Sequence, residues 1–304
     1  MFEKLSYKML LPSLTVVLLF MTACNDTASS QERVANVPDV TVREGTEEYE
    51  GFVMDNVMSF SDIPEDLHYH LYVPESYDGS KPYALYITLP GHGSYLELDS
   101  DTGLNIKQES YATRAVSYND KMIVAALQLS EIEDKYEDIM NEFSVHSEQV
   151  IEFTEYMFAK YNIDLNRVYI SGYSRGGRVM SIVCTKRPDL YSAALSISSK
   201  WEGDEEVIVK NRLPIYFVIG EHDESFGSEP FRETYEKIVS LYEQEKVAPE
   251  ELEKLAVLDI KDDDYFTSRN CDRQHLGADL FAFDDDVMNW LVNHDNWVIK
   301  APKK

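Results

Sequence analysis

The sequence predicts an α/β fold: a doubly wound, mostly parallel β-sheet with helices on both faces. From about residue 50, short apolar runs alternate with longer stretches of helical periodicity, which is the pattern of such a sheet. The runs from Tyr83 onward are rich in Val, Ile, Ala, Leu and Tyr and alternate little, as strands buried on both faces do. With 304 residues, 44% of them apolar, the chain can bury a large core. We expect one domain over residues 49–304.

The first two expected strands suit an antiparallel pair. Only a short Ser-Asp-Ile-Pro-Glu-Asp connection separates Tyr49–Met58 from His68–Val73. The runs that suit buried parallel strands are Tyr83–Leu89, Met122–Leu127, Asn166–Gly172, Tyr191–Ser198, Pro214–Gly220 and Lys254–Ile260.

Helical segments are expected between these strands. Ser144–Tyr161 carries apolar residues at a spacing that makes one inward stripe, among them Val150, Phe153 and Phe158. Three further segments have a similar pattern, namely Gly176–Thr185, Ser228–Glu245 and Asp284–Asn293.

The N-terminus has the pattern of a processing signal. Lys4 and Lys8 precede an apolar run, Met9–Ala23, which has the length of a signal peptide and is short for a membrane span. The segment Phe-Met-Thr-Ala-Cys24 resembles a bacterial lipobox, in which the cysteine is lipidated and becomes the mature N-terminus. An ordinary cleaved secretory signal is the alternative.

We therefore expect residues 1–24 to be a lipoprotein signal peptide and residues 25–48 a solvated tether. The lipid on Cys24 would anchor the protein to a membrane of the bacterial cell envelope, facing the periplasm or the cell surface. Asn25 rather than Asp follows the cysteine, so the inner-membrane retention signal of some Gram-negative bacteria is absent.

The charge balance argues against nucleic acid as a partner. Acidic residues outnumber basic ones 55 to 28, for a net charge of -27, so the chain would repel phosphate backbones. The acidic runs Asp262–Asp264 and Asp284–Asp286 lack ligand spacing, and we expect neither a metal nor another cofactor. Cys184 and Cys271 can form a disulfide in an oxidising compartment, or remain two buried free thiols.

The turn around Ser174 carries the clearest indication of chemistry. A β-type run leads into Gly172-Tyr-Ser174-Arg-Gly176-Gly, and a helix-compatible stretch follows. A nucleophilic serine on a strained strand-to-helix turn needs small residues two before and two after it, because the backbones pack closely there. We therefore predict that Ser174 is a nucleophile; an accidental turn serine is the alternative.

A serine nucleophile needs a base, and chain order selects His275. In a doubly wound hydrolase the order along the chain is Ser, acid, His. Four of the seven histidines precede Ser174, and His222 precedes the expected acid. His294 ends the last helix pattern, whereas His275 lies in a polar segment after the last expected strand, where a loop can bring its imidazole to the serine.

The acid that orients the base is expected just after the strand Pro214–Gly220. Three carboxylates crowd the loop there, at Glu221, Asp223 and Glu224. Asp223 is the prediction, because a Gly-x-x-Asp turn after that strand matches the hydrolase pattern, and the two glutamates are the alternatives.

The oxyanion of a tetrahedral intermediate needs about two preorganised N–H donors. One is expected from Arg175, directly after the nucleophile. The other is expected from Leu89-Pro-Gly-His-Gly93, where His92 or Gly93 could donate, although Pro-Gly is also an ordinary turn former. His92 is otherwise expected to line the cleft.

Trp201 is a weaker candidate for substrate binding. It follows the strand after the nucleophile helix, at the tip that points toward the expected cleft, where its ring could stack on an aryl or sugar group. A core tryptophan that covers a loop is the alternative.

Taken together, these residues resemble the α/β-hydrolase superfamily, and more closely its bacterial esterase branch. That branch includes feruloyl and acetylxylan esterases, polyhydroxybutyrate depolymerase-like enzymes and prolyl oligopeptidase-like proteins. The resemblance covers roughly residues 65–295. It is carried by Tyr-Asn-Ile-Asp-Leu-Asn-Arg-Val before the turn, Gly-Tyr-Ser-Arg-Gly-Gly, Gly-Glu-His-Asp, and Gln-His followed by Leu-Phe-Ala and Trp-Leu.

Two residues depart from the family pattern. Relatives usually place glycine after the histidine, where this chain has Leu276, and a small residue, Met or Gln after the serine, where it has Arg175. Both departures leave the three predicted catalytic residues intact. Because Arg175 puts a charge close to the oxyanion hole, we expect substrate preference to be influenced beside the serine.

The resemblance implies a serine hydrolase acting on small-molecule or polymeric carboxylic esters through an acyl-enzyme intermediate. One rival is a prolyl oligopeptidase-like peptidase; those enzymes commonly carry a large gating domain, for which we expect no room in this chain. The other rival is a catalytically inactive surface-binding lipoprotein on a hydrolase scaffold. The presence of Ser174, Asp223 and His275 in the required order argues against it.

Overall fold

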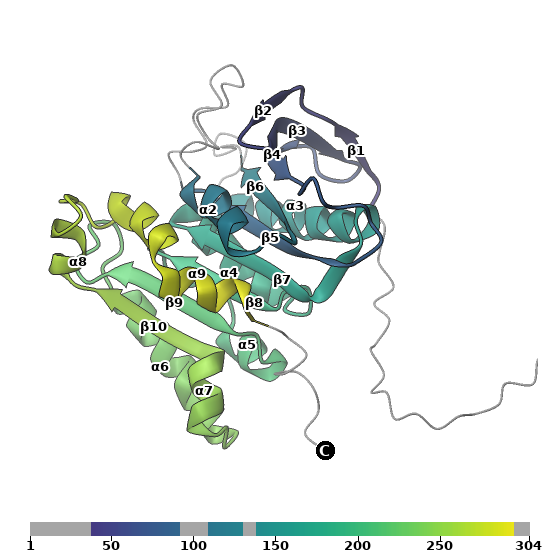
Figure 1. Cartoon of the computed structure of the whole chain (residues 1–304). Coiled ribbons are helices and arrows are strands. Elements are labelled where there is room, and N and C mark those ends of the chain that lie inside the picture. The colour runs from purple at the N-terminus through teal and green to yellow at the C-terminus, as the bar shows by residue number, and fades with distance from the viewer. Residues whose placement is uncertain (1–37, 92–108, 130–137, 295–304) are drawn as a thin grey trace, which may run out of the picture. The chain divides into compact units, whose positions relative to one another are not determined.

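The computed structural model describes residues 38–91, 109–129 and 138–294. Its centre is a ten-stranded sheet with the order β1-β3-β4-β6-β5-β7-β8-β9-β10, and β2 pairs with β3 (Figure 1). The strands are β1 (Val40–Arg43), β2 (Glu47–Tyr49), β3 (Phe52–Phe60), β4 (Leu67–Tyr72), β5 (Tyr83–Leu89), β6 (Met122–Gln128), β7 (Ile163–Tyr173), β8 (Ala193–Ile197), β9 (Ile215–Gly220) and β10 (Ala256–Lys261).

The strand directions follow the prediction. All pairs from β6 through β5, β7, β8 and β9 to β10 are parallel. The strands β1 to β4 pair antiparallel, and β4 joins β6 antiparallel as well. The expected strands are therefore confirmed, together with the antiparallel N-terminal pair.

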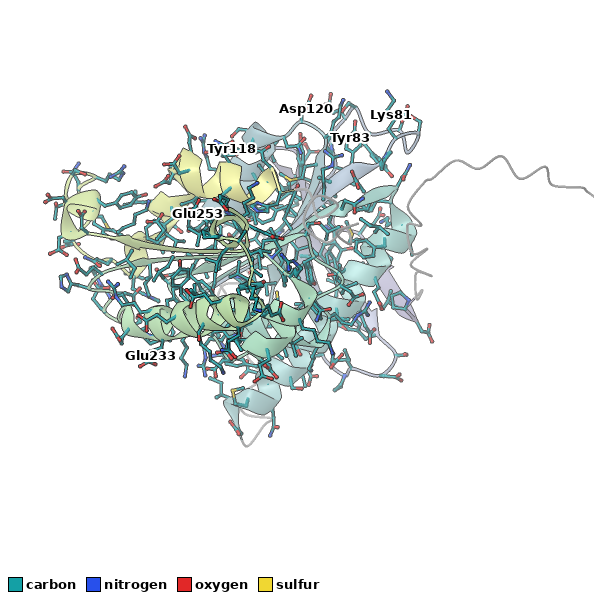
Figure 2. All side chains as sticks on the ribbon, turned by 90° about the horizontal axis from the view of Figure 1, so that it is seen from below. Lys81, Tyr83, Tyr118, Asp120, Glu233 and Glu253 are labelled. Atoms are coloured by element: carbon teal, nitrogen blue, oxygen red, sulfur yellow. The ribbon has the colours of Figure 1, made fainter. Side chains whose placement is uncertain are left out.

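Helices cover both faces of the sheet, as Figure 1 shows. They are α2 (Ser110–Tyr118), α3 (Ile139–Lys160), α4 (Arg175–Lys186), α5 (Glu205–Asn211), α6 (Glu229–Gln244), α7 (Pro249–Leu255), α8 (Asp263–Thr267), the 3₁₀ segment η3 (Leu276–Phe283) and α9 (Asp285–Val292). Figure 2 places Tyr118 of α2 and Glu233 of α6 on opposite sides of the sheet. The Tyr118 hydroxyl donates to Asp285 at 2.7 Å and so links α2 to α9.

Each face of the sheet has its own apolar core. The residues of β5 alternate between them: Leu85 and Ile87 pack with α3, α4 and α6, whereas Ala84 and Tyr86 pack with α2 and α9. This double burial explains why the parallel strands are almost continuously apolar. Such strands fix the positions of the loops at their carboxyl ends, where a site is expected in this class of sheet.

The expected N-terminal boundary of the domain was wrong. The predicted tether, residues 25–48, includes β1 and β2, and β1 pairs with β3 over Val40–Arg43. These strands are short and mostly exposed on one side, so their apolar signal is weak. The predicted signal peptide 1–24, with Cys24, lies outside the described residues, as do residues 25–37 of the tether and both His92 and Gly93.

Two further predictions concern the membrane and the thiols. Within residues 38–91, 109–129 and 138–294, no helix is long and apolar enough to cross a membrane. In the same ranges no disulfide joins the cysteines: Cys184 is buried, and the partly exposed Cys271 thiol donates to the carbonyl of Arg273.

Candidate active site

Ser174 lies on a sharp turn between β7 and α4. Its backbone has φ 52° and ψ −115°, a conformation that few residues other than glycine adopt. Hydrogen bonds hold this conformation on both sides. The Ser174 N–H donates to the carbonyl of Ile197 at 2.9 Å, and the Ser199 hydroxyl donates to the carbonyl of Ser174 at 2.6 Å. The serine is thus presented at the carboxyl edge of the sheet in a fixed orientation.

The glycines around Ser174 are required by close backbone contacts. A Cβ on Gly172 would lie 2.5 Å from the carbonyl oxygen of Gly176. A Cβ on Gly176 would lie 2.4 Å from the carbonyl oxygen of Pro90, which accepts the Gly176 N–H at 3.0 Å. The pattern of small residues in the sequence therefore has the predicted cause, and it also brings the loop after β5 against the start of α4.

His275 approaches Ser174 from the segment that precedes η3. Its Nε2 lies 3.0 Å from the Ser174 Oγ. The imidazole lies between two aromatic rings, with its centroid 5.3 Å from that of Tyr173 and 5.6 Å from that of Phe226. The Tyr173 hydroxyl also donates to the His275 carbonyl at 2.9 Å. Ring and backbone are therefore both held.

Asp223 is buried and accepts three hydrogen bonds. Its Oδ2 lies 2.8 Å from the His275 Nδ1, and its Oδ1 accepts the N–H groups of Ser225 and Phe226 at 3.0 and 2.9 Å. Burial raises the pKa of this carboxyl, but the hydrogen bonds from His275 and from the two N–H groups outweigh it, so the pKa lies below its ordinary value. Asp223 is thus the carboxylate that faces the imidazole, as the sequence predicts.

Glu224 holds the backbone of His275 instead of its ring. Its two carboxylate oxygens accept the N–H groups of Gln274 and His275, each at 2.8 Å. This residue was an alternative for the acid, and its role as a backbone clamp was missed. The loop after β9 therefore fixes the histidine twice, through neighbouring carboxylates.

Gln274 completes the contact between the two loops. Its Oε1 accepts the N–H of His222 at 2.7 Å, and its Nε2 donates to Asp263 at 2.6 Å. A Cβ on Gly220 would lie 2.2 Å from that Oε1, so the end of β9 requires glycine. The Gln-His pair of the sequence is thus a docking element for the histidine segment.

The surroundings of the expected oxyanion donors are partly described. Arg175 is the first residue of α4, and N–H groups of a first helical turn have no partner within the helix. Gly91, at the end of the described loop, packs closely on Tyr173, where an added Cβ would lie 2.6 Å from the ring. The second expected donor, His92 or Gly93, falls outside the described residues.

The Arg175 side chain is buried and forms an ion pair. It is 6% exposed and forms an ion pair with Glu142 of α3, which is fully buried. The Arg175 guanidinium also lies 5.5 Å from the ring centroid of Phe143. The Arg175 charge is therefore paired with an acid of α3, and an influence of Arg175 on substrate preference stays a prediction.

Trp201 belongs to the core. It is 9% exposed and packs edge-on against Phe217 of β9, with the ring centroids 5.8 Å apart. This arrangement matches the alternative that the sequence left open. The prediction of a substrate-stacking tryptophan is not supported.

A buried acid beside the loop after β5 was also missed. Glu109 precedes α2 and accepts a hydrogen bond from the Thr88 hydroxyl at 3.2 Å. Burial, together with the negative charge of Asp279, raises the pKa of Glu109 to about 8. Its distance in sequence from the Ser174 turn left no signal that could have found it. Within the described part of the chain, no group of three or more His, Cys, Asp or Glu side chains is arranged to hold a metal ion.

Comparison with known proteins gives one family match. Residues 135–248 match the model of the prolyl oligopeptidase family. This segment contains Ser174 and Asp223 and ends before His275. Comparison with curated proteins finds no match.

Several solved structures share the fold. A thermostable esterase has a TM-score of 0.63 and 19% identity, over 81% of this chain and 63% of its own length. Esterase 2 of Thermogutta terrifontis, phosphoramylated by tabun, has a TM-score of 0.52 and 14% identity, over 84% of this chain and 98% of its own. A dipeptidyl aminopeptidase IV described as putative, from Bacteroides ovatus ATCC 8483, has a TM-score of 0.53 and 12% identity, over 84% and 36%.

These similarities show a shared fold. The described chain spans less than two thirds of the thermostable esterase and about a third of the aminopeptidase. The chain therefore has the α/β-hydrolase fold, and its central segment, residues 135–248, matches the model of the prolyl oligopeptidase family.

Proposed function

We propose that the protein is a serine hydrolase that cleaves carboxylic esters through an acyl-enzyme intermediate. The observation that carries this proposal is the hydrogen-bonded chain from Ser174 to His275 to Asp223, with distances of 3.0 and 2.8 Å, on a strained turn at the carboxyl edge of the sheet. A serine with a base in reach, and a base oriented by a buried acid, is the arrangement that nucleophilic acyl transfer requires.

Each residue has a defined part in the proposed reaction. The Ser174 hydroxyl donates its proton to His275 Nε2 as Oγ attacks the ester carbonyl, and the imidazolium then gives that proton to the leaving alcohol. His275 Nδ1 keeps its own proton and uses it to donate a hydrogen bond to the Asp223 carboxylate, which fixes the imidazole tautomer. A water molecule then attacks the acyl-enzyme, with His275 again taking and returning the proton. This step releases the carboxylic acid and restores the Ser174 hydroxyl.

The negative charge on the carbonyl oxygen needs donors that are already in place. The Arg175 N–H, at the start of α4, is the first proposed donor. His92 or Gly93 remains the prediction for the second, since the loop after β5 docks on α4 through the Gly176 N–H and the Pro90 carbonyl.

A peptidase is the second candidate. The match of residues 135–248 to the prolyl oligopeptidase family favours it, and so does the fold shared with an aminopeptidase. The esterase reading is supported by the shared fold of two esterases and by the sequence resemblance. Amides are harder to cleave than esters, so relative rates on matched substrates separate the two.

The test compares wild-type protein with Ser174→Ala. We expect the wild type to hydrolyse p-nitrophenyl acetate, and the variant to lose at least about 10³-fold in kcat, because the attacking oxygen is gone. Faster turnover of a prolyl p-nitroanilide than of the aryl ester would assign the peptidase instead.

Labelling by a fluorophosphonate probe addresses the inactive-scaffold alternative. The probe forms a bond with an activated serine only, so the wild type is expected to be labelled and Ser174→Ala is not. Circular dichroism of both proteins controls for folding. A folded wild type that neither turns over esters nor takes the probe would contradict the proposal.

We also propose that the protein is a lipoprotein of the bacterial cell envelope, anchored through a lipid on Cys24. The proposal rests on the lipobox-like segment that ends at Cys24. The substrate would then be a small-molecule or polymeric ester that reaches the envelope.

A further inference from the structure

We propose that Arg175 is a positioning residue whose ion pair with Glu142 holds the oxyanion-binding N–H of Arg175 in place. The inference rests on the proposed function, since it concerns the oxyanion hole of that reaction. The Arg175 side chain would then act on the reaction by restraining the backbone N–H of the same residue. Its charge would interact with Glu142 and not with the substrate.

The pair is buried, and this makes it an effective anchor. Arg175 is 6% exposed and Glu142 is 0% exposed, and the Arg175 Nη2 donates to Glu142 Oε1. Burial raises the pKa of Glu142, but hydrogen bonds from His146 and Arg175 and the guanidinium charge outweigh it and lower the pKa, so the acid stays charged. Removal of one partner from such a pair leaves an uncompensated buried charge.

Glu142 is itself held by a chain of side chains along α3. His146 Nε2 lies 3.3 Å from Glu142 Oε1, and His146 Nδ1 lies 2.8 Å from Gln149 Oε1. The Gln149 amide donates to the carbonyl of Glu65 at 2.8 Å. The hydrogen bonds that hold Glu142 therefore extend from α3 to the connection between β3 and β4.

The position of Arg175 explains why it needs such an anchor. Its neighbours are both fixed by main-chain contacts: the Ser174 carbonyl accepts the Ser199 hydroxyl, and the Gly176 N–H donates to Pro90. The peptide that carries the Arg175 N–H contains the Ser174 carbonyl, and it links a residue at φ 52° to a helix. A tether on the Arg175 side chain restrains the tilt of this peptide, and an oxyanion donor loses effect when its direction changes slightly.

The same helix offers a matched control. Arg178, one turn further along α4, also forms an ion pair, at 2.7 Å to Glu202. Its guanidinium lies 4.6 Å from the centroid of the Phe143 ring that Arg175 also contacts. The two arginines share helix, aromatic neighbour and type of partner, but only Arg175 carries the proposed donor.

The experiment compares Arg175→Met, Arg178→Met and the double variant Arg175→Met/Glu142→Leu. For Arg175→Met we expect kcat on p-nitrophenyl acetate to fall about 10- to 100-fold with KM within about 2-fold, because the transition-state contact is impaired. Arg178→Met is expected to keep kcat within about 2-fold of the wild type.

The double variant separates positioning from stability. It removes both charges of the Arg175–Glu142 pair, so its thermal unfolding midpoint is expected to lie above that of Arg175→Met. Its kcat and its rate of fluorophosphonate labelling are expected to stay low, because the tether is still missing. A double variant with wild-type kcat would overturn the inference and leave the pair a structural one.

Failure of the positioning inference can be distinguished from failure of the proposed hydrolase function. If wild type and Arg178→Met turn over esters and Ser174→Ala does not, the hydrolase proposal holds whatever the Arg175 variants do. If Arg175→Met and Arg178→Met lose activity equally while folded, the positioning inference fails and the hydrolase proposal is unaffected.

Discussion

Two buried carboxyl groups, Asp223 and Glu109, are held in opposite protonation states at neutral pH. Asp223 accepts hydrogen bonds from His275 and two N–H groups, and these overcome the effect of burial and keep its pKa low. Glu109 accepts one hydrogen bond, from Thr88, and burial and Asp279 raise its pKa to about 8. The number of donors that face a buried acid thus decides its charge.

The raised pKa of Glu109 predicts that the stability of the folded protein depends on pH. The folded state keeps the proton up to about pH 8, whereas an unfolded glutamate releases it near the ordinary value of 4.5. Stability is therefore lost as the pH rises between these values. Glu109→Gln keeps an oxygen for Thr88 and removes the titration, so we expect its unfolding midpoint to exceed that of the wild type by about 2–5 °C at pH 8 and by less at pH 5.

Circular dichroism melts at the two pH values measure this difference. Glu233→Gln is the control, because Glu233 is exposed on α6 (Figure 2). If the difference in unfolding midpoint between Glu109→Gln and the wild type does not increase from pH 5 to pH 8, the buried carboxyl is charged in the folded protein and the prediction is wrong.

At the scale of elements, the site depends on contacts between two loops. The loop after β9 supplies Asp223 and Glu224, and the segment before η3 supplies Gln274 and His275. The acid loop holds both the ring and the backbone of the histidine. An error in either contact moves the imidazole relative to Ser174.

Glu224→Ala tests the backbone clamp. It removes both acceptors of the Gln274 and His275 N–H groups, so we expect kcat for ester hydrolysis to fall about 10-fold or more while Asp223 is still present. Glu224→Gln retains one oxygen acceptor and is expected to lie between Ala and wild type.

Glu221→Ala is the matched control for the clamp. Glu221 lies in the same loop and is exposed, and its backbone N–H still donates to Lys261 when the side chain is removed. Equal kcat values for Glu221→Ala and Glu224→Ala would contradict a role of the clamp in holding the histidine.

The sequence predicts the sheet well because its signals are local. The apolar runs from Tyr83–Leu89 to Pro214–Gly220 correspond to strands, since burial on both faces demands continuous apolar residues. The last run, Lys254–Ile260, overlaps the half-buried strand β10. The edge strands β1 and β2 were not predicted, and neither were the helices α2, α5, α7 and α8 and the segment η3. These elements are short, and their identity depends on what they pack against.

The site is predictable only where chain order and motif restrict the choice. Ser174 is marked by its glycines. Chain order leaves His275 and His294, and His275 is selected because it lies in a polar segment after the last expected strand. The directions of side chains are not local properties: Arg175 turns to Glu142 and Trp201 to Phe217, across contacts that no spacing in the sequence encodes.

At the scale of the whole molecule, charge and anchor act in opposite directions. The net charge of -27 repels anionic lipid surfaces, so attraction to the headgroups does not hold the domain at a membrane. A lipid on Cys24 would supply the attachment that the charge opposes. We therefore expect attachment to depend on that cysteine alone.

Cys24→Ser tests the anchor in a bacterial host. The wild type is expected to incorporate an alkyne-tagged palmitate and to sediment with membranes, whereas the variant loses both and is recovered in the soluble fraction. Cys271→Ser, which changes a partly exposed thiol of the domain, is expected to behave as the wild type. Unlabelled, soluble wild-type protein would favour an ordinary secretory signal.

The separation of Ser174 and His275 along the chain has a consequence for biogenesis. The two residues are 101 positions apart, and β8, β9 and β10 must be made between them. At about 5–20 residues per second, a ribosome that has finished the serine needs on the order of 5–20 s before the histidine exists. If Ser174 and His275 are the proposed nucleophile and base, the nascent chain cannot carry out the proposed reaction for most of its synthesis. Activity is then expected only after the segment that holds His275 has folded onto the rest of the domain.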